Sequence, residues 1–194
     1  MKLLLASKSP RRRQLLSELG YPVEFISLDV DEHVSKGTPA ADTAELLARR
    51  KADACPPEAL SQDTVLVTAD TVVVLDGQVL GKPSDRAEAL AMLHSLAGRS
   101  HTVYTGVCLR TASKTLSFTE RTEVHFRPLN DEELAYYVDT YRPYDKAGAY
   151  GIQEWIGMVG ISHIEGCFYN VMGLPVARLY EHLQRLFPGL PDAR

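Results

Sequence analysis

The sequence is poor in the features that mark membrane, disulfide-bonded and zinc-binding proteins. No stretch approaches the roughly 18 consecutive apolar residues that mark a membrane-spanning helix. Cys55, Cys108 and Cys167 are the only cysteines, and their spacing fits neither a disulfide framework nor a zinc site. The first apolar run, residues 3–6, is only about half as long as a signal-peptide core, and basic residues follow it. We therefore expect a soluble cytoplasmic protein with reduced thiols and no membrane partner.

Several familiar catalytic signatures are also missing. The sequence contains no GxxxxGK(S/T), GxGxxG, HExxH or GxSxG pattern. Its six histidines are dispersed, with no pair at metal-ligand spacing. Any phosphate chemistry must then depend on side chains and a helix terminus rather than on a glycine-rich loop.

Neither sign of charge is in large excess, because the net charge is only −4. Its distribution is uneven. Residues 1–13 hold five of the 21 basic side chains and none of the 25 acidic ones, which leaves 16 basic and 25 acidic side chains elsewhere. A concentrated positive spot on an acidic body fits a compact polyanion better than a long nucleic-acid duplex.

Strand-like and helix-like segments alternate along the 194 residues, which are enough for the single domain that we expect over residues 1–194. The expected strands are 3–6, 23–26, 65–75, 78–80, 102–109 and 115–126. The expected helices are 9–20, 38–54, 84–98 with Ser84 as its cap, a short one capped by Asn130 and Glu133, and 176–187. A hairpin turn at Asp76-Gly77 and an antiparallel pair predict an α/β fold with a mixed sheet. The longest irregular regions, 28–37 and 141–173, are candidate site loops.

The basic turn, residues 7–12 with the sequence Ser-Lys-Ser-Pro-Arg-Arg, lies between the first strand and the first helix. We interpret it as an anion site, because the free N–H groups and the dipole of a helix start attract anions. Guanidinium groups also match phosphate in a bidentate fashion. The alternative is a helix cap followed by a solvated basic surface, although basic side chains in a first turn oppose the helix dipole.

Asp70 and Thr71 interrupt the apolar run 65–74. A carboxylate in such a run costs free energy unless it is paired or binds a metal. We therefore interpret Asp70 as a catalytic or metal-binding residue. The alternatives are an edge-strand position that faces water and an internal hydrogen bond to Thr71.

Two lysines are weaker candidates. Lys82 follows the hairpin in the segment Gly81-Lys82-Pro83, and Lys51 lies near the apolar edge of its helix. Each is either solvated or directed into a cleft.

Two loop segments carry further polar groups. The carboxylates of residues 29–32, Asp-Val-Asp-Glu, suit a hard cation such as Mg²⁺, although their spacing alone favours an acidic surface loop. In residues 144–153, small residues between two tyrosines allow a flat ligand to approach, and Gln153 can bind the edge of a base. The alternative for this segment is a tight turn with its tyrosines in the core.

Taken together and in this order, these motifs resemble the Maf family of nucleoside triphosphate pyrophosphatases. The resemblance runs from Leu5 to about Phe187, nearly the whole chain. It rests on residues 5–12 (LASKSPRR), 69–73 (ADTVV), 81–83 (GKP), 145–153 (DKAGAYGIQ) and 170–175 (NVMGLP).

The resemblance implies hydrolysis of a nucleoside triphosphate between the α- and β-phosphates, giving the monophosphate and pyrophosphate. The form of residues 145–153 is similar to that of the subgroup acting on dTTP and UTP, with modified pyrimidine nucleotides as further substrates to test. The resemblance also implies an ITPase-like, Maf/Ham1-like fold: a two-lobed mixed sheet with flanking helices and an active-site cleft between the lobes. It suggests a homodimer.

The family pattern places the general base at Asp70 and a divalent cation, Mg²⁺ or Mn²⁺, on Glu32 and Asp70. Lys8 and Arg13 are variable positions, so their charges are not counted. Arg12, Thr71 and Gln153 are the positions that discriminate between substrates. The residues expected to bind the substrate are Ser7, Ser9, Arg11, Arg12, Lys51, Thr71, Lys82 and Gln153.

The alternative from another class is a regulatory nucleotide- or nucleic-acid-binding protein acting in cell division. It explains the basic residues 11–13 but leaves Asp70 unexplained, and we expect no stable nucleic-acid partner. A nucleic-acid binder would lose affinity steeply between low and moderate salt. Within enzymes, the alternative is a purine-directed pyrophosphatase with the same phosphate-binding residues.

Overall fold

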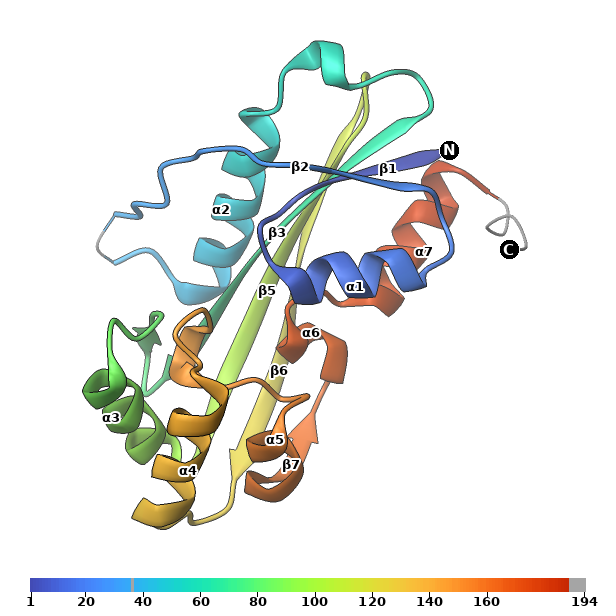
Figure 1. The fold of residues 1–194 in the computed structure, drawn as a ribbon. Coiled ribbons are helices and arrows are strands. Elements are labelled where there is room, and N and C mark those ends of the chain that lie inside the picture. Colours follow the sequence, from blue (N-terminus) through green and yellow to red (C-terminus); the bar gives the residue numbers. More distant parts are fainter. Residues whose placement is uncertain (36, 189–194) are drawn as a thin grey trace. The chain divides into compact units, whose positions relative to one another are not determined.

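One mixed sheet organises the computed structural model shown in Figure 1, in which residues 1–35 and 37–188 are described. Within that part the strand order is β2-β1-β3-β5-β6-β7, with β4 beside β3. The strands are β1 (Lys2–Ala6), β2 (Val23–Ile26), β3 (Thr64–Leu75), β4 (Gln78–Leu80), β5 (Ser100–Arg110), β6 (Thr115–Phe126) and β7 (Ile161–Glu165). Strand β1 pairs in parallel with β2 and β3, whereas β3–β4 and β6–β7 are antiparallel. The predicted α/β class with a mixed sheet is confirmed.

Helices flank the sheet, as predicted. They are α1 (Pro10–Glu18), α2 (Ala40–Asp53), α3 (Arg86–Leu96), α4 (Asp131–Tyr141), α5 (Trp155–Gly160), α6 (Phe168–Met172) and α7 (Val176–Leu186), with short 3-10 turns η1 (Pro57–Ala59) and η2 (Ala147–Ala149). The predicted capping box of Asn130 and Glu133 opens α4. Asp76 and Gly77 both have positive φ in the predicted hairpin turn.

The prediction that Ser84 caps α3 is wrong. Asp85 caps the helix, and its side chain accepts the N–H of Glu88 at 2.8 Å. Ser84 instead donates its hydroxyl to the Glu88 carboxylate at 2.6 Å. Serine and aspartate are equally good caps, so two adjacent ones leave the sequence pattern undecided.

Residues 141–173 are also less irregular than predicted, because they contain η2, α5, β7 and α6. Each of these elements has six residues or fewer. Segments that short carry too little periodicity to identify, and they depend on tertiary packing. By contrast, no helix or strand occurs among the described residues of 28–37.

The chain divides into two compact units, in agreement with the predicted two-lobed form. Unit 1 contains residues 1–70, 105–120 and those from 173 onward, and unit 2 contains residues 71–104 and 121–172. Asp70 therefore belongs to unit 1 and Thr71 to unit 2. That residues 1–194 form a single domain stays a prediction.

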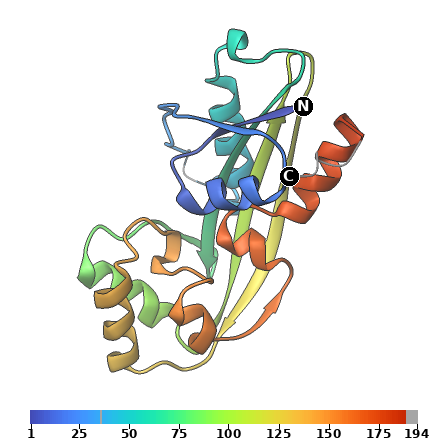
Figure 2. The ribbon, with the colours of Figure 1, turned by 45° about the vertical axis from the view of Figure 1, so that its right-hand side comes forward.

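In unit 1, α2 covers one face of the sheet, and α1 and α7 cover the other (Figures 1 and 2). Alternate residues of each strand supply the two faces. The core on the α2 side consists of Leu4, Ala6, Ala48, Ala52, Cys55, Leu60, Leu66 and Cys108. Gly106 of β5 allows this close packing, since a Cβ there would lie 2.3 Å from the backbone of Ala44. The position of α2 matters because this helix carries Lys51.

In unit 2, a smaller core forms around β3, β5 and β6. It consists of Val73, Val103 and Val124, with Leu80, Ala147, Ile161, Ile164 and Val171 packed against them. Across residues 1–35 and 37–188, every helix is too short or too polar to traverse a bilayer.

Candidate active site

The basic turn folds as a helix start. Ser9 has an extended backbone and caps α1, and its side chain accepts the N–H of Arg12 at 3.5 Å. The Ser7 hydroxyl oxygen accepts the N–H of Ser9 at 3.2 Å. Pro10 occupies the first helical turn, which contains no acidic residue. The sequence therefore produces the predicted turn, with a helix N-terminus left without negative side chains of its own.

Arg12 is anchored to the backbone at two distant points of unit 1. Its Nε donates to the carbonyl of Gly173 at 2.7 Å, and its Nη1 donates to the carbonyl of Ala69 at 2.9 Å. Burial lowers the pKa of the guanidinium below its usual value, and the Asp70 carboxylate opposes that shift. Arg11, the residue before Arg12, is half-buried, and its charge lowers the pKa of Arg12 further. These bonds link the basic turn to the residue before Asp70.

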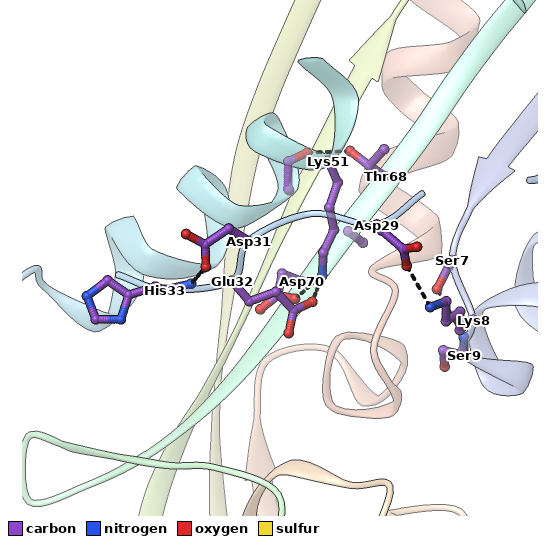
Figure 3. A network of polar contacts seen from close by, with 12 residues as sticks. Ser7, Lys8, Ser9, Asp29, Asp31, Glu32, His33, Lys51, Thr68 and Asp70 are labelled. Atoms are coloured by element: carbon purple, nitrogen blue, oxygen red, sulfur yellow. Dashed lines mark hydrogen bonds and ion pairs between the residues drawn. The ribbon is translucent and has the colours of Figure 1, made fainter. Parts of the chain in front are cut away.

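Asp70 is paired, as its apolar surroundings required. Lys51 of α2 places its Nζ 2.5 Å from Asp70 Oδ1 and 2.8 Å from Glu32 Oε1 (Figure 3). The side chains of Lys51 and Asp70 are only 16% and 15% exposed. The ammonium therefore offsets the cost of holding a carboxylate away from water. The alternative of an edge-strand position that faces water is wrong, because the Asp70 side chain is largely buried and bound to Lys51.

Two features direct Lys51 and Asp70 toward each other. The Thr68 hydroxyl donates to the Ala48 carbonyl at 2.6 Å and so ties α2 to β3 one turn before Lys51. Strand β1 pairs with β3 only as far as Val67. Asp70 therefore lies beyond the end of the parallel pairing, after the point at which β1 ends and the basic turn begins.

Only one carboxylate of residues 29–32 joins this cluster. Glu32 binds Lys51, whereas Asp29 forms an exposed ion pair with Lys8 at 3.1 Å and Asp31 accepts the N–H of His33 at 2.8 Å (Figure 3). The structure therefore brings together Ser7, Ser9, Arg11, Arg12, Glu32, Lys51 and Asp70 within unit 1. Thr71, Lys82 and Gln153 belong to unit 2.

Within unit 2, three of the motifs are in contact. The N–H of Gly148 donates to the carbonyl of Gly81 at 3.0 Å, which joins residues 81–83 to residues 145–153. Gly148 has positive φ, and a Cβ on it would lie 3.0 Å from the side chain of Val73 on β3. Lys82, which follows Gly81, and Gln153 are exposed, and Thr71 is half-buried on β3.

The tyrosines of residues 144–153 differ from each other. Tyr150 is buried, and its hydroxyl lies 2.7 Å from Nε2 of His101. Tyr144 is exposed. The alternative of a turn with core tyrosines therefore holds for Tyr150 alone, and Gln153 remains accessible to a ligand.

The donor set fits a hard divalent cation. Glu32 and Asp70 already converge on one cationic group, the Lys51 ammonium. Mg²⁺ is commonly bound by one or two carboxylates, with phosphate oxygens and water as its other ligands. Among the described residues no group of three acidic, histidine or cysteine side chains could hold a metal by itself. The two carboxylates therefore suit a metal that arrives with a phosphate ligand.

Comparison with known proteins identifies the family. A family model described as "Maf-like protein" matches residues 2–186. The chain belongs to the Maf family. A Bacteroides thetaiotaomicron protein named dTTP/UTP pyrophosphatase is 50% identical over 186 residues, which cover 95% of this chain and 96% of that protein. A Porphyromonas gingivalis (strain W83) protein of the same name is 50% identical over 185 residues, covering 94% and 93%.

One solved structure, "The structure of the Staphylococcus aureus Ham1 protein", aligns with a TM-score of 0.46 and 18% identity. The alignment covers 65% of this chain and 72% of that chain.

Some contacts of this Maf-family site cannot be predicted from the sequence. The partners of Arg12 are the carbonyls of Ala69 and Gly173, and a carbonyl is present in every residue. Gly173 does lie in the motif 170–175, which is the only sequence signal pointing toward it.

Proposed function

We propose that this protein is a nucleoside triphosphate pyrophosphatase that hydrolyses dTTP and UTP to the monophosphate and pyrophosphate. One observation carries the proposal: Arg12 of the basic turn bonds to the carbonyl of Ala69, next to Asp70 and its partner Lys51. An anion-binding helix start thus adjoins a carboxylate that can activate water. The names of the relatives, which are half identical to this chain, support the choice of substrate.

In this proposal the basic groups bind the triphosphate. Ser7, Ser9 and the first N–H groups of α1 offer hydrogen bonds, and the guanidinium groups of Arg11 and Arg12 offer charge. Lys51 and Lys82 add two ammonium groups. Together these groups would stabilise the negative charge that develops on the leaving pyrophosphate.

Asp70 is proposed as the general base that takes a proton from the attacking water. Its Oδ1 accepts the Lys51 ammonium at 2.5 Å, so we assign the proton to Oδ2. Lys51 would hold the carboxylate in place while the water attacks the α-phosphorus.

Glu32 and Asp70 are the residues that would hold Mg²⁺ or Mn²⁺. When bound, such an ion neutralises phosphate oxygens and orients the substrate. Because the Lys51 ammonium lies between both carboxylates, this lysine must yield part of its contact to a bound ion.

The function is tested by measuring pyrophosphate release from a panel of purine and pyrimidine triphosphates, with Mg²⁺ or Mn²⁺ present. We expect dTTP and UTP to be turned over most efficiently, with the monophosphate as the second product. Release of inorganic phosphate, or no turnover of any nucleotide, would contradict the proposal. Preference for a purine triphosphate would support the rival pyrophosphatase with the same phosphate-binding residues.

Removal of the metal is expected to abolish activity, and Glu32→Gln is expected to weaken metal binding. Loss of one of two carboxylate ligands should raise the Mn²⁺ concentration for half-maximal rate by about tenfold. Mn²⁺ binding in the presence of a non-hydrolysable triphosphate, followed by electron paramagnetic resonance, provides a readout other than activity. Asp31→Asn is the control, because Asp31 bonds to the backbone of His33. Equal Mn²⁺ affinity in Glu32→Gln and the parent would remove Glu32 from the site.

Gln153→Ala is expected to change base preference more than triphosphate binding. The amide of Gln153 can both donate to and accept from a base edge. The triphosphate, by contrast, is the same in every nucleotide and cannot distinguish one base from another. We expect kcat/KM for dTTP and UTP to fall about tenfold relative to that for purine triphosphates. An equal loss for every nucleotide would show that Gln153 does not read the base.

The homodimer suggested by the family pattern and a cytoplasmic location are also part of the proposal. Light scattering of the purified protein tests the first. Buried thiols at Cys55 and Cys108 are consistent with the second.

A further inference from the structure

A connected group of polar side chains lies beneath the turn that carries Gln153. Residues 151–154 form this turn, and the N–H of Glu154 donates to the carbonyl of Gly151 at 3.0 Å across it. Gln153 is exposed, whereas Gly151 and Ile152 are buried and Glu154 is half-buried. The turn therefore has one accessible side chain on an otherwise enclosed backbone.

Tyr137 of α4 holds both ends of the turn. Its hydroxyl oxygen accepts the N–H of Gly151 at 3.0 Å, and its hydroxyl proton is donated to the Glu154 carboxylate. The residue is 0% exposed. Burial and the bond to Glu154 raise the pKa of this phenol far above its usual value, so it stays protonated and able to donate. One hydroxyl thus fixes the residues at both ends of the turn.

Lys146 completes the group from the other side. Its ammonium lies 3.1 Å from Glu154 Oε1 and 2.8 Å from Asp145 Oδ1. Its side chain is only 9% exposed. The Glu154 carboxylate therefore has a charged partner on one oxygen and the phenol on the other.

The turn has little room to adjust. A Cβ on Gly151 would lie 2.9 Å from the Glu154 carboxyl carbon and 3.2 Å from Gln153 Nε2. Gly157, the third residue of α5, approaches Ile152 so closely that a Cβ would overlap its carbonyl. The backbone on both sides of Gln153 is thus fixed by close contacts as well as by hydrogen bonds.

A contribution to stability is a poor explanation for a buried cluster of polar side chains such as this one. Replacing a buried ion pair by apolar side chains is often neutral or stabilising, so its presence is weak evidence for a stabilising role. A fully hydrogen-bonded network does, however, fix one geometry among several of similar energy. The geometry fixed here is that of the turn 151–154.

We propose that Tyr137, Glu154 and Lys146 are positioning residues that orient Gln153 for selection of the pyrimidine base. This inference rests on the proposed base-reading role of Gln153. None of the three side chains needs to touch the substrate. They act by holding the backbone of the turn, so that the Gln153 amide meets the base without first losing conformational freedom.

Tyr137→Phe tests the proposal, because it removes one oxygen atom and keeps the buried ring. We expect the ratio of kcat/KM for dTTP to kcat/KM for a purine triphosphate to fall about fivefold to tenfold. The change should appear in KM for dTTP and UTP, with kcat nearly retained. Tyr141→Phe is the matched control: it lies one turn further along α4 and its ring stacks on Tyr137 at 5.1 Å. It should leave the ratio unchanged.

A double-mutant cycle separates this inference from the role of Gln153 itself. If Tyr137 acts through Gln153, adding Tyr137→Phe to Gln153→Ala should change the selectivity ratio no further. Glu154→Gln, which keeps the shape and removes the charge, provides a second variant if Tyr137→Phe does not fold. It too should lower selectivity in the parent and have no effect in Gln153→Ala.

The outcomes are distinct. If Gln153→Ala loses selectivity while Tyr137→Phe and Glu154→Gln keep it, the positioning role is wrong and the proposed function stands. If the two effects add, Tyr137 acts independently of Gln153, and the inference is also wrong. If Gln153→Ala keeps its selectivity, the base-reading role itself fails.

Discussion

Replacing Asp70 by asparagine is expected to lower kcat for pyrophosphate release from dTTP by about a thousandfold. Asparagine keeps the size of the side chain but cannot accept a proton from water. It also removes the negative partner 2.5 Å from Lys51. Glu32 still pairs with that ammonium at 2.8 Å, so the lysine is not left buried without a counter-charge. The loss should therefore fall on the reaction rather than on folding, as thermal unfolding of the variant can verify.

Asp29→Asn is the matched control for Asp70→Asn. Asp29 is a loop carboxylate of the same unit, fully exposed and paired only at the surface with Lys8. It should retain parent activity within about twofold, since exposed ion pairs contribute little. Activity of Asp70→Asn within a few fold of the parent would exclude Asp70 as the base.

A titration with Mn²⁺ distinguishes the two roles assigned to Asp70. If the carboxylate acts chiefly as a metal ligand, excess Mn²⁺ should restore part of the activity of Asp70→Asn by mass action. If it acts chiefly as the base, saturating metal should leave the rate low.

Replacing Arg12 by methionine is expected to cost both stability and activity. Two buried carbonyls, those of Ala69 and Gly173, would lose their charged donor. We expect the free energy of unfolding to fall by about 3 kcal/mol, measured by denaturant titration. The kcat/KM for dTTP should also fall by about a hundredfold, because a guanidinium at the phosphate site is lost.

Arg13→Met is the control for Arg12→Met. Arg13 is the next residue of α1, and it donates to a single carbonyl, that of Ser7, at 3.1 Å. It should lose about 1 kcal/mol of stability and little activity. Equal effects of the two substitutions would mean that Arg12 has no special position in the site.

Local patterns predicted the fold well where each element carries its own signal. Strand 23–26 and the strand 115–126 have the predicted ends, and the Asp76-Gly77 turn is where positive φ required it. The short elements α5, β7 and α6 were not predicted, because their stability comes from neighbours distant in sequence. Asp85 rather than Ser84 caps α3, and the sequence does not distinguish two adjacent residues that both suit the position.

The sequence predicted which residues belong to the candidate site but not which of them are in contact. The position of a carboxylate in the run 65–74 predicted that Asp70 is paired or binds a metal, and the helix pattern left Lys51 either solvated or directed into a cleft. Nothing in the sequence joined the two, because their contact depends on how α2 packs on β3. The same holds for Tyr137, which lies 14 residues before Gly151 and looks like an ordinary core tyrosine. Sequence spacing gives no information about such contacts.

The burial of two cysteines has a practical consequence for labelling. Cys55 and Cys108 lie in the core beneath α2, and burial raises the pKa of both thiols, that of Cys108 to about 11. Alkylating reagents attack the thiolate, so these two sulfurs are poor targets in the folded protein. Cys167 is partly exposed and lies in unit 2, the unit that carries Gln153. A maleimide dye added to the unaltered protein is therefore directed to that unit, without removal of any natural cysteine.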